Sequence, residues 1–311
     1  MKNFLTREHS SLRKRTSRNH FGFKVKTMGF IACLALFFSC SSEENPVDPI
    51  DNTPRLNKSD SLAMVNIYKA IGPWGNWDLE DIQTWGGVAI AHDLDKNEYR
   101  IVGLEYYQGS FNGDFPDELR KLTELRRLAI IGGSLSGQIP EWIGELKHLY
   151  YLALGSNNMS GEIPESIGQL KKLKMLSLQY CQISGELPES LGDIDSLQYL
   201  HIGDTNKGGE IPKSLSKLKH LKQLIFINNK FSGTFPLEVA QEKLAIDCTN
   251  NNIEELPFEI WSHPSKPKPN LQGNRLSGTI PDSIKGLPKW EDCKGFVGRQ
   301  QKGYGYSNYN N

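Results

Sequence analysis

The stretch His148–Lys171 reads HLYYLALGSNNMSGEIPESIGQLK, and the same pattern fills the blocks on either side of it without a gap. These blocks are Glu124–Lys147 (ELRRLAIIGGSLSGQIPEWIGELK), Lys172–Asp195 (KLKMLSLQYCQISGELPESLGDID) and Ser196–Lys219 (SLQYLHIGDTNKGGEIPKSLSKLK). Weaker copies begin at Arg100, His220 and Lys243, and LQGNRLSGTIP at Leu271–Pro281 belongs to a last, incomplete one. About eight units with a fixed period indicate a solenoid, in which each unit buries its apolar face only by stacking on its neighbours.

Each unit carries the signals of a short strand followed by a tight turn. In His148–Lys171 we expect Leu149, Leu152 and Leu154 to point inward, the last two from alternate strand positions. The glycine of the S-G-x-I-P segment permits a positive φ, and the proline prevents helix at that point.

The pattern L-x-x-L-x-L-x-x-N/C-x-L with the added S-G-x-I-P resembles the leucine-rich repeat of plant receptor ectodomains, which also occurs in bacterial surface proteins. The resemblance covers about 100–289. It implies an α/β repeat solenoid, a curved arc with a parallel sheet on its concave face. It also implies a helical, Trp-rich N-terminal cap over 59–99, with W-G-G-V at Trp85–Val88, and a short C-terminal cap and tail over 290–311.

The cap helix is expected over Ser59–Gly72, beginning at Ser59 or Asp60, with an apolar face that includes Leu62 and Ile67. The cysteine pair usual in such caps is missing, so we expect Trp74, Trp77 and Trp85 to seal the end by burial. In the seventh repeat, Ile253–Pro257 (IEELP) lacks the glycine and one residue, which predicts a local irregularity in curvature.

One position of every unit is expected to form a structural ladder, because its side chain can satisfy backbone groups that the turn leaves unpaired. We assign this ladder to Asn157, Cys181, Thr205, Asn229, Asn251 and Asn274. Gly109 and Gly133 occupy the same position in the first two units. Cys181 is therefore interpreted as a ladder residue rather than a catalytic or metal-binding one.

The outward strand positions line the concave face in rows, because equivalent residues of adjacent strands lie about 4.8 Å apart. These rows hold aromatic, Arg and apolar side chains, which are typical of interface hot spots. We assign ligand contacts to Tyr107, Arg127, Ile131, Tyr151, Met175, Tyr180, Tyr199, His201, Asp204, Ile225 and Ile227. This pattern favours recognition of a protein or peptide. Tyrosines also stack on sugars, so a glycan ligand remains an alternative, as does a passive envelope spacer.

The first 39 residues hold eight basic residues and one acid, and Met28–Phe38 (MGFIACLALFF) is too short to span a bilayer. This is typical of an export signal. The Ser39–Cys40 junction resembles a lipobox, although Phe37 replaces the usual Leu. We therefore expect lipidation of Cys40 and an outer-membrane anchor. The Ser/acidic run Ser41–Glu44 resembles the surface-export signal of Bacteroidetes lipoproteins, and 40–58 is expected to be a flexible, acidic, Pro-rich tether.

No sequence motif points to catalysis, a cofactor or a metal. The chain lacks G-x-S-x-G, H-E-x-x-H, C-x-x-C and P-loop patterns. His201 and Asp204 could form an acid/base pair, but no nucleophile accompanies them, so a binding role is preferred. Asp93, Asp95 and Asn97 have the spacing of the first ligands of a calcium-binding loop. Glu98 stands where such a loop needs glycine, and Leu104 stands where it needs the bidentate Glu, so we interpret the segment as a solvated turn. A Cys248–Cys293 bridge is left open.

The charge balance bears on the partners. Lys and Arg together number 36, as do Asp and Glu, which gives no support to nucleic-acid binding. The segment 100–311 holds 24 basic and 24 acidic residues, so the repeat array is neutral overall. We therefore expect a monomeric module that recognises its ligand by contact rather than by long-range charge steering.

Overall fold

The computed structural model describes residues 55–71, 78–79, 81–107, 112–262, 268–286, 294–295 and 297–307. The chain divides into two compact units, Met1–Pro46 with Trp77–Trp85, and Val47–Asn76 with Gly86–Asn311. The described part of the first unit contains the 3₁₀ helix η1 (Ile82–Thr84) and the buried Trp85, whose indole Nε1 donates to Asp78 O at 2.8 Å. The signal segment, Cys40, most of the tether, Trp74, Trp77 and Cys293 lie outside the described residues.

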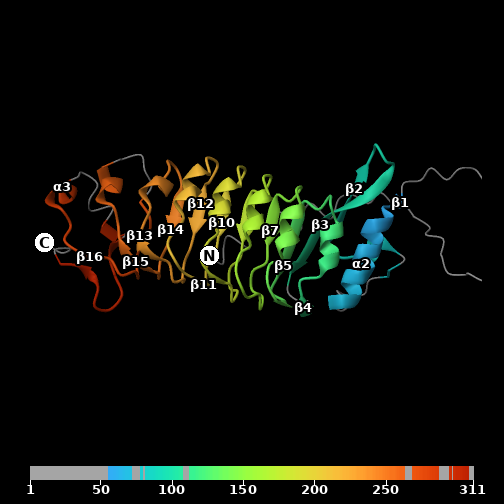
Figure 1. Cartoon of the computed structure of the whole chain (residues 1–311), viewed down its shortest axis with the longest axis horizontal. Helices are drawn as coiled ribbons and strands as arrows, with labels where there is room; N and C mark the ends of the chain where they lie inside the picture. Colours follow the sequence, from blue (N-terminus) through green and yellow to red (C-terminus); the bar gives the residue numbers. More distant parts are fainter. Residues whose placement is uncertain are drawn as a thin grey trace, which may run out of the picture. The chain divides into compact units, whose positions relative to one another are not determined.

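A nine-stranded sheet organises the second unit (Figure 1). Eight strands follow the order β1-β3-β5-β7-β8-β10-β12-β14, and their pairing is parallel throughout. The ninth strand, β2, pairs antiparallel with β3. The strands are β1 (Arg55–Leu56), β2 (Val88–Asp93), β3 (Glu98–Tyr107), β5 (Arg127–Ile131), β7 (Tyr151–Ala153), β8 (Met175–Ser177), β10 (Tyr199–His201), β12 (Gln223–Ile225) and β14 (Ala245–Asp247).

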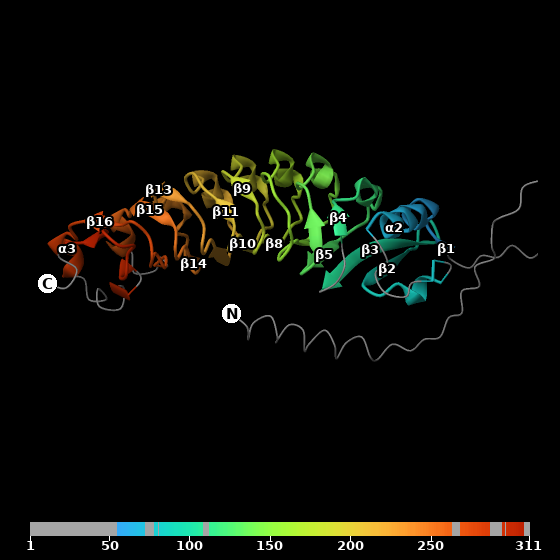
Figure 2. The same cartoon turned by 90° about the horizontal axis from the view of Figure 1, so that it is seen from below.

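From β3 onward, a short 3₁₀ helix returns the chain after each strand of this sheet. Figure 2 shows the strands along the inner side of the curve of this unit and the helices along its outer side. The helices are η2 (Asp117–Lys121), η3 (Glu141–Glu145), η4 (Glu165–Gln169), η5 (Glu189–Asp193), η6 (Lys213–Lys217), η7 (Leu237–Val239) and η8 (Phe258–Ser262). A proline in extended conformation precedes η2 to η7, since its fixed φ suits the residue before a helix. The predicted repeat solenoid with a parallel sheet on its concave face is confirmed.

Between sheet and helices, most coils turn through a second, shorter set of parallel strands. The pairs are β4 (Asn112–Asp114) with β6 (Ser134–Ser136), β9 (Ser184–Gly185) with β11 (Asn206–Lys207), β13 (Ser232–Thr234) with β15 (Asn252–Glu255), and β16 (Ser277–Gly278) with β17 (Gly305–Tyr306). Gly161 shows why glycine is needed here. Its φ is +71°, and a Cβ would lie 2.6 Å from the Gln138 side chain of the preceding coil.

The core is a column of leucine and isoleucine side chains between the strands and the helices. Leu149, Leu152 and Leu154 are completely buried, and the equivalent residues of the other coils are also buried. One position breaks the pattern. Lys207 occupies the place held by Leu135, Met159 and Ile183 in earlier coils, and it is also fully buried. Its Nζ donates to Ser184 O at 2.6 Å and to Glu186 O at 2.8 Å, which satisfies two of its three protons.

Helix α2 (Lys58–Ile71) lies where the cap helix is expected, but its N-terminus differs from the prediction. Asn57, rather than Ser59 or Asp60, caps it, since Asn57 Oδ1 accepts from the N–H groups of Ser59 at 2.9 Å and Asp60 at 3.1 Å. The buried face is also rotated: Ile67 is buried with Ala63 and Met64, while Leu62 remains 56% exposed.

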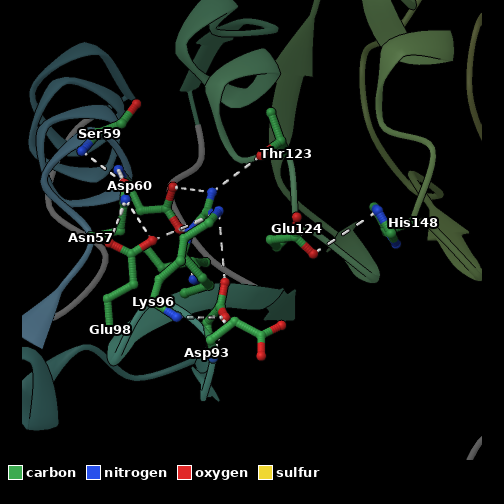
Figure 3. Close-up of polar contacts among 12 residues, drawn as sticks. Asn57, Ser59, Asp60, Asp93, Lys96, Glu98, Thr123, Glu124 and His148 are labelled. Carbon is green, nitrogen blue, oxygen red and sulfur yellow. Dashed lines mark hydrogen bonds and ion pairs between the residues drawn. The ribbon is translucent and has the colours of Figure 1, made fainter. Parts of the chain in front are cut away.

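Asp60 is instead the centre of a buried polar contact, drawn in Figure 3. Arg100 of β3 donates from Nε and Nη2 to the two carboxylate oxygens of Asp60, each at 3.0 Å, and the Ile101 N–H donates to Oδ2 at 2.9 Å. Arg100 Nη2 also reaches Thr123 Oγ1 at 3.1 Å. The hydrogen bond that Arg100 donates to Asp60 raises the pKa of Arg100, although burial lowers it. These contacts fasten α2 to the first coils.

The C-terminal end of the described chain continues the solenoid. Gln300 takes the ladder position: its Nε2 donates to Val297 O, Gly298 O and Leu271 O, and its Oε1 accepts from Leu276 N at 3.1 Å. Helix α3 (Asp282–Lys285) precedes this coil, and β17 closes it. Part of the segment assigned to a cap and tail is therefore one more coil. Where the seventh repeat pairs with the sixth, the register shifts, since Gly233 of β13 pairs with Ile253 of β15 and Thr234 pairs with Glu255.

Candidate ligand-binding face

The sheet register brings the predicted contact residues into rows. Arg127 pairs with Tyr151, Tyr151 with Met175, Met175 with Tyr199, and Tyr199 with Gln223. Their side chains are partly exposed, whereas the residues that alternate with them, such as Leu128 and Leu152, are completely buried. One face of the sheet is thus core and the other is free for contact.

At the N-terminal end of this face, Arg127 forms a polar and aromatic cluster. Its guanidinium carbon lies 4.4 Å from the Tyr151 ring centroid, and its Nε donates to Glu105 Oε1. Tyr107 donates to the other oxygen of Glu105 at 3.1 Å. Burial lowers the pKa of Arg127, but the hydrogen bond and charge of Glu105 outweigh it and hold that pKa above its ordinary value. Burial, followed by the charge of Glu105, raises the pKa of the Tyr107 phenol. The cluster therefore presents an ordered cation and a neutral phenol.

In the middle of the face, His201 has a different partner from the one the sequence indicates. Its Nε2 lies 2.8 Å from Gln223 Oε1, and its ring meets the Tyr199 ring edge-on with centroids 6.3 Å apart. Asp204 is not its hydrogen-bond partner, so the His–Asp acid/base pair is not formed. Burial lowers the pKa of His201, which favours a neutral ring that donates to Gln223.

Along the edge where the strands end, four exposed or half-exposed polar side chains form a continuous chain. Asn250 Nδ2 donates to Asn228 Oδ1 at 2.7 Å, and Asn228 Nδ2 donates to Asp204 Oδ1 at 2.6 Å. The charge of Asp204, more than burial or its hydrogen bond, raises the pKa of the Tyr180 phenol. All four residues have φ between 54° and 57°. The sequence assigned Tyr180 and Asp204 to contacts and missed this shared left-handed conformation, although Asn and Asp are the residues that tolerate it best.

Ile227 corrects the prediction of an exposed apolar contact, because only 8% of it is exposed. The neighbouring coil has Gly203 at the same position, and Ile227 Cγ1 lies 3.7 Å from where a Gly203 Cβ would be. The missing side chain leaves a space that Ile227 fills. Tyr107 and Tyr180 are the most exposed of the assigned contacts, at 38% and 53%. The remaining assigned residues are half-buried: Arg127, Ile131, Tyr151, Met175, Tyr199, His201, Asp204 and Ile225.

The ladder residues lie buried beneath this face, and all of them except Thr205 bond to the preceding coil. Asn157 Nδ2 donates to Ile130 O at 2.7 Å and its Oδ1 accepts from Gly133 N at 3.2 Å. Asn229, Asn251 and Asn274 donate in the same way to Ile202 O, Phe226 O and Cys248 O. The Cys181 thiol bonds to Leu154 O at 3.2 Å, and Thr205 Oγ1 donates to Asn229 Oδ1.

The described residues contain no group of three or more His, Cys, Asp or Glu side chains that could hold a metal ion. Asp93 instead caps the β2–β3 turn, where its Oδ1 accepts from the N–H groups of Asp95 and Lys96.

Cys181 and Cys248 are buried free thiols, and burial raises the pKa of both. Of the helices in the described ranges, none has the length and apolar character needed to cross a bilayer.

Comparison with known proteins agrees with this architecture. A family model described as a leucine-rich repeat region matches residues 99–294. No curated protein sequence matches the chain. Among solved structures, a plant peptide hormone receptor, RGFR1 in complex with RGF2, is 35% identical with a TM-score of 0.55, over 58% of this chain and 30% of the receptor chain. The PEPR1–AtPEP1 structure is 26% identical with a TM-score of 0.61, over 72% and 32%.

The Arabidopsis receptor kinase HAESA, in complex with the peptide hormone IDA and the co-receptor SERK1, is 25% identical with a TM-score of 0.51, over 72% of this chain and 47% of the other. The chain thus spans about a third of the length of the first two receptors. The family model covers well over half of the chain, and its matched residues include every coil from β3 to α3. The chain belongs to the leucine-rich repeat family.

Proposed function

We propose that the protein is a lipid-anchored surface protein that recognises a protein or peptide ligand on the exposed face of its sheet. The observation that carries this proposal is the row Arg127–Tyr151–Met175–Tyr199, in which an ordered guanidinium stacks on a half-buried tyrosine. Arg and Tyr are the residues in which binding energy concentrates at interfaces. The matched RGFR1 and HAESA structures are complexes with peptide hormones, which supports the same ligand class here.

The proposal concerns recognition rather than catalysis. His201, the best candidate for acid/base work, bonds to the neutral side chain of Gln223 instead of a carboxylate. A second candidate, glycan binding, is favoured by the exposed chain Tyr180–Asp204–Asn228–Asn250, because phenol, carboxylate and amide groups suit sugar hydroxyls.

A photo-crosslinking capture experiment with the full chain tests the site. Replacing Tyr151, Tyr180 and Tyr199 together by Ala should abolish ligand capture while the circular dichroism spectrum remains unchanged. Replacing Glu165, Glu189 and Lys213 by Ala, three exposed residues of the 3₁₀ helices, is the matched control and should leave capture intact. Unchanged capture by the tyrosine variant would locate the site elsewhere. Capture that disappears after glycosidase treatment of the ligand would favour the glycan.

The anchor and the display at the surface have separate tests. Cys40→Ala should shift the protein from the membrane to the soluble fraction and abolish incorporation of labelled fatty acid, because only the acyl chains hold it in the membrane in this proposal. Equal membrane retention of that variant would refute the anchor. Protease shaving of intact cells should remove the protein from the outer surface, and its survival would indicate a periplasmic orientation.

A further inference from the structure

The loops that lead into the strands carry a concentration of positive charge. Arg126, Lys174 and Lys222 immediately precede strands β5, β8 and β12 and therefore lie in one row with Tyr150 and Gln198. Backbone hydrogen bonds fix this row, since Lys174 N donates to Tyr150 O and Lys222 N donates to Gln198 O, each at 2.8 Å. On the same edge, three or four residues before strands β7, β8 and β12, lie Lys147, Lys171, Lys172 and Lys219. We call these seven exposed side chains the basic ridge.

None of the seven forms an ion pair with a described residue. Where they have hydrogen-bond partners, those partners are neutral. Lys222 Nζ donates to Gln198 Oε1 at 2.8 Å, Lys147 Nζ to Gln169 Oε1 at 2.6 Å, and Lys219 Nζ to the backbone oxygen of Ser216 at 2.8 Å. Lys172 Nζ lies 3.2 Å from His148 Nδ1. No described carboxylate therefore neutralises the charges of the ridge.

Acidic residues are scarce on this edge. Glu124 Oε2 lies 4.0 Å from His148 Nε2, a pair that Figure 3 draws. Asp195 is exposed in the loop before β10, and Glu242 is exposed in the loop before β14. Asp193 and Glu145, which lie in the preceding 3₁₀ helices, are already paired with Lys217 and Arg120. The seven cations of the ridge thus share this edge with three carboxylates, Glu124, Asp195 and Glu242, that form no ion pair with a described lysine or arginine.

The compensating acids of the repeat array occupy other rows. Glu141, Glu165 and Glu189 open the 3₁₀ helices η3, η4 and η5. The turns before η4, η5 and η6 hold Glu162, Glu186 and Glu210. The net charge of the repeat array is zero, but basic side chains gather on one edge and acidic side chains on another. The expectation of recognition without charge steering rested on the net charge alone, and the structure revises it.

We propose that the basic ridge binds an acidic polypeptide segment of the ligand, a proposal that rests on the proposed function of the sheet face. The ridge is continuous with that face, since Lys174 adjoins Met175 and Lys222 adjoins Gln223 in the chain. A polypeptide bound across the strands would contact the ridge along one of its sides. Like charges in adjacent coils repel one another, and an acidic segment relieves that repulsion while fixing the position of the ligand.

Fluorescence anisotropy of the full chain with a labelled eight-residue oligoglutamate tests the ridge. Binding should weaken at least tenfold in the variant with Lys172, Lys174 and Lys222 all replaced by Glu, and it should fall as NaCl is raised. The matched control replaces Lys213, Lys230 and Lys302, exposed lysines off the ridge, by Glu and changes the net charge equally. It should retain binding within about twofold. If both variants weaken oligoglutamate binding equally, net charge alone explains the effect and the proposal is overturned.

A labelled sulfated polysaccharide is the competing probe. If it binds more tightly than oligoglutamate and depends on the same three lysines, the ridge serves an anionic glycan and the peptide proposal is wrong.

The Tyr151, Tyr180 and Tyr199 variant should keep oligoglutamate binding, because it leaves the ridge intact. If oligoglutamate binding does not depend on the three lysines while ligand capture still depends on the three tyrosines, only the proposal for the ridge is refuted. If capture does not depend on the tyrosines while oligoglutamate binding depends on the lysines, only the proposal for the sheet face is refuted. Thermal melts of each variant confirm folding.

Discussion

The Arg100 guanidinium holds the Asp60 carboxylate with two hydrogen bonds of 3.0 Å, joining helix α2 to strand β3 across forty residues of sequence. Both side chains are buried, and Asp60 also accepts the Ile101 N–H at 2.9 Å. The fork of Arg and the two oxygens of a carboxylate match in geometry, so this contact fixes orientation as well as distance.

Replacing Asp60 by Ala should lower the free energy of unfolding by about 3–5 kcal/mol, because it leaves the Arg100 charge buried without its partner. Urea unfolding at neutral pH, followed by circular dichroism, measures the change. Asp95→Ala is the control, since Asp95 is exposed in the β2–β3 turn, and it should alter stability by no more than about 0.5 kcal/mol. Similar effects of the two substitutions would show that the pair is not what holds α2.

The ladder makes a graded prediction. Asn251→Ala removes the donor to Phe226 O and Cys248 O and the acceptor of Phe231 N, and should cost about 2–4 kcal/mol. Cys181→Ala, at the equivalent position, removes mainly one thiol contact to Leu154 O and should cost about 1 kcal/mol. Urea unfolding of the two variants compares them directly. A larger loss for Cys181→Ala would contradict the assigned hydrogen-bond roles.

Lys207 gives the folded state a pH dependence. Burial lowers its pKa to about 8 from an ordinary value of 10.5, so between these values the unfolded state binds more protons. Stability should therefore rise with pH across this window, by up to about 1.4 kcal/mol per pH unit, and Lys207 should contribute no slope below pH 8. In Lys207→Met this rise should be missing. Unfolding free energies of both proteins from pH 7 to 10.5 test it, and parallel curves would rule out the lowered pKa.

Gln300→Ala should loosen the last coil without affecting the earlier ones. The Leu276 N–H loses its acceptor, and its amide should exchange faster with deuterium, as should those of β16 and β17. Amides in β7 and β8 should keep their protection. Hydrogen-exchange mass spectrometry provides the measurement, with Lys302→Ala as the control. Unchanged exchange at Leu276 would show that Gln300 is not a ladder residue.

The periodic part of the fold could be predicted because each coil repeats the same pattern of apolar, glycine and proline residues. Leu152 and Leu154 alternate along a strand, and a glycine and a proline punctuate the turn, so the buried column and the sheet register follow from spacing alone. Contacts outside the period could not be predicted in this way. Nothing in the local sequence indicates that Asp60 meets Arg100, and Asp60 itself resembles a helix cap.

Residues within the period were mispredicted where a neighbouring coil decides their environment. Ile227 is buried because the adjacent coil has glycine, and His201 bonds to Gln223 because the next strand brings it within 2.8 Å. Lys207 could have been noticed, since it stands at an apolar position of the repeat. Gln300 was missed because its coil lacks the leucine spacing that marks the others.

The ladder has a direction. The amides of Asn157, Asn229 and Asn274 donate to carbonyls of the coil before them, and Asn157 also accepts from N–H groups of that earlier coil. At these Asn positions, each turn is completed by its successor. An array cut before such an Asn leaves the last turn without these partners, so ending the solenoid carries a cost of its own. A chain emerging from its N-terminus can add coils one at a time onto a template that is already in place.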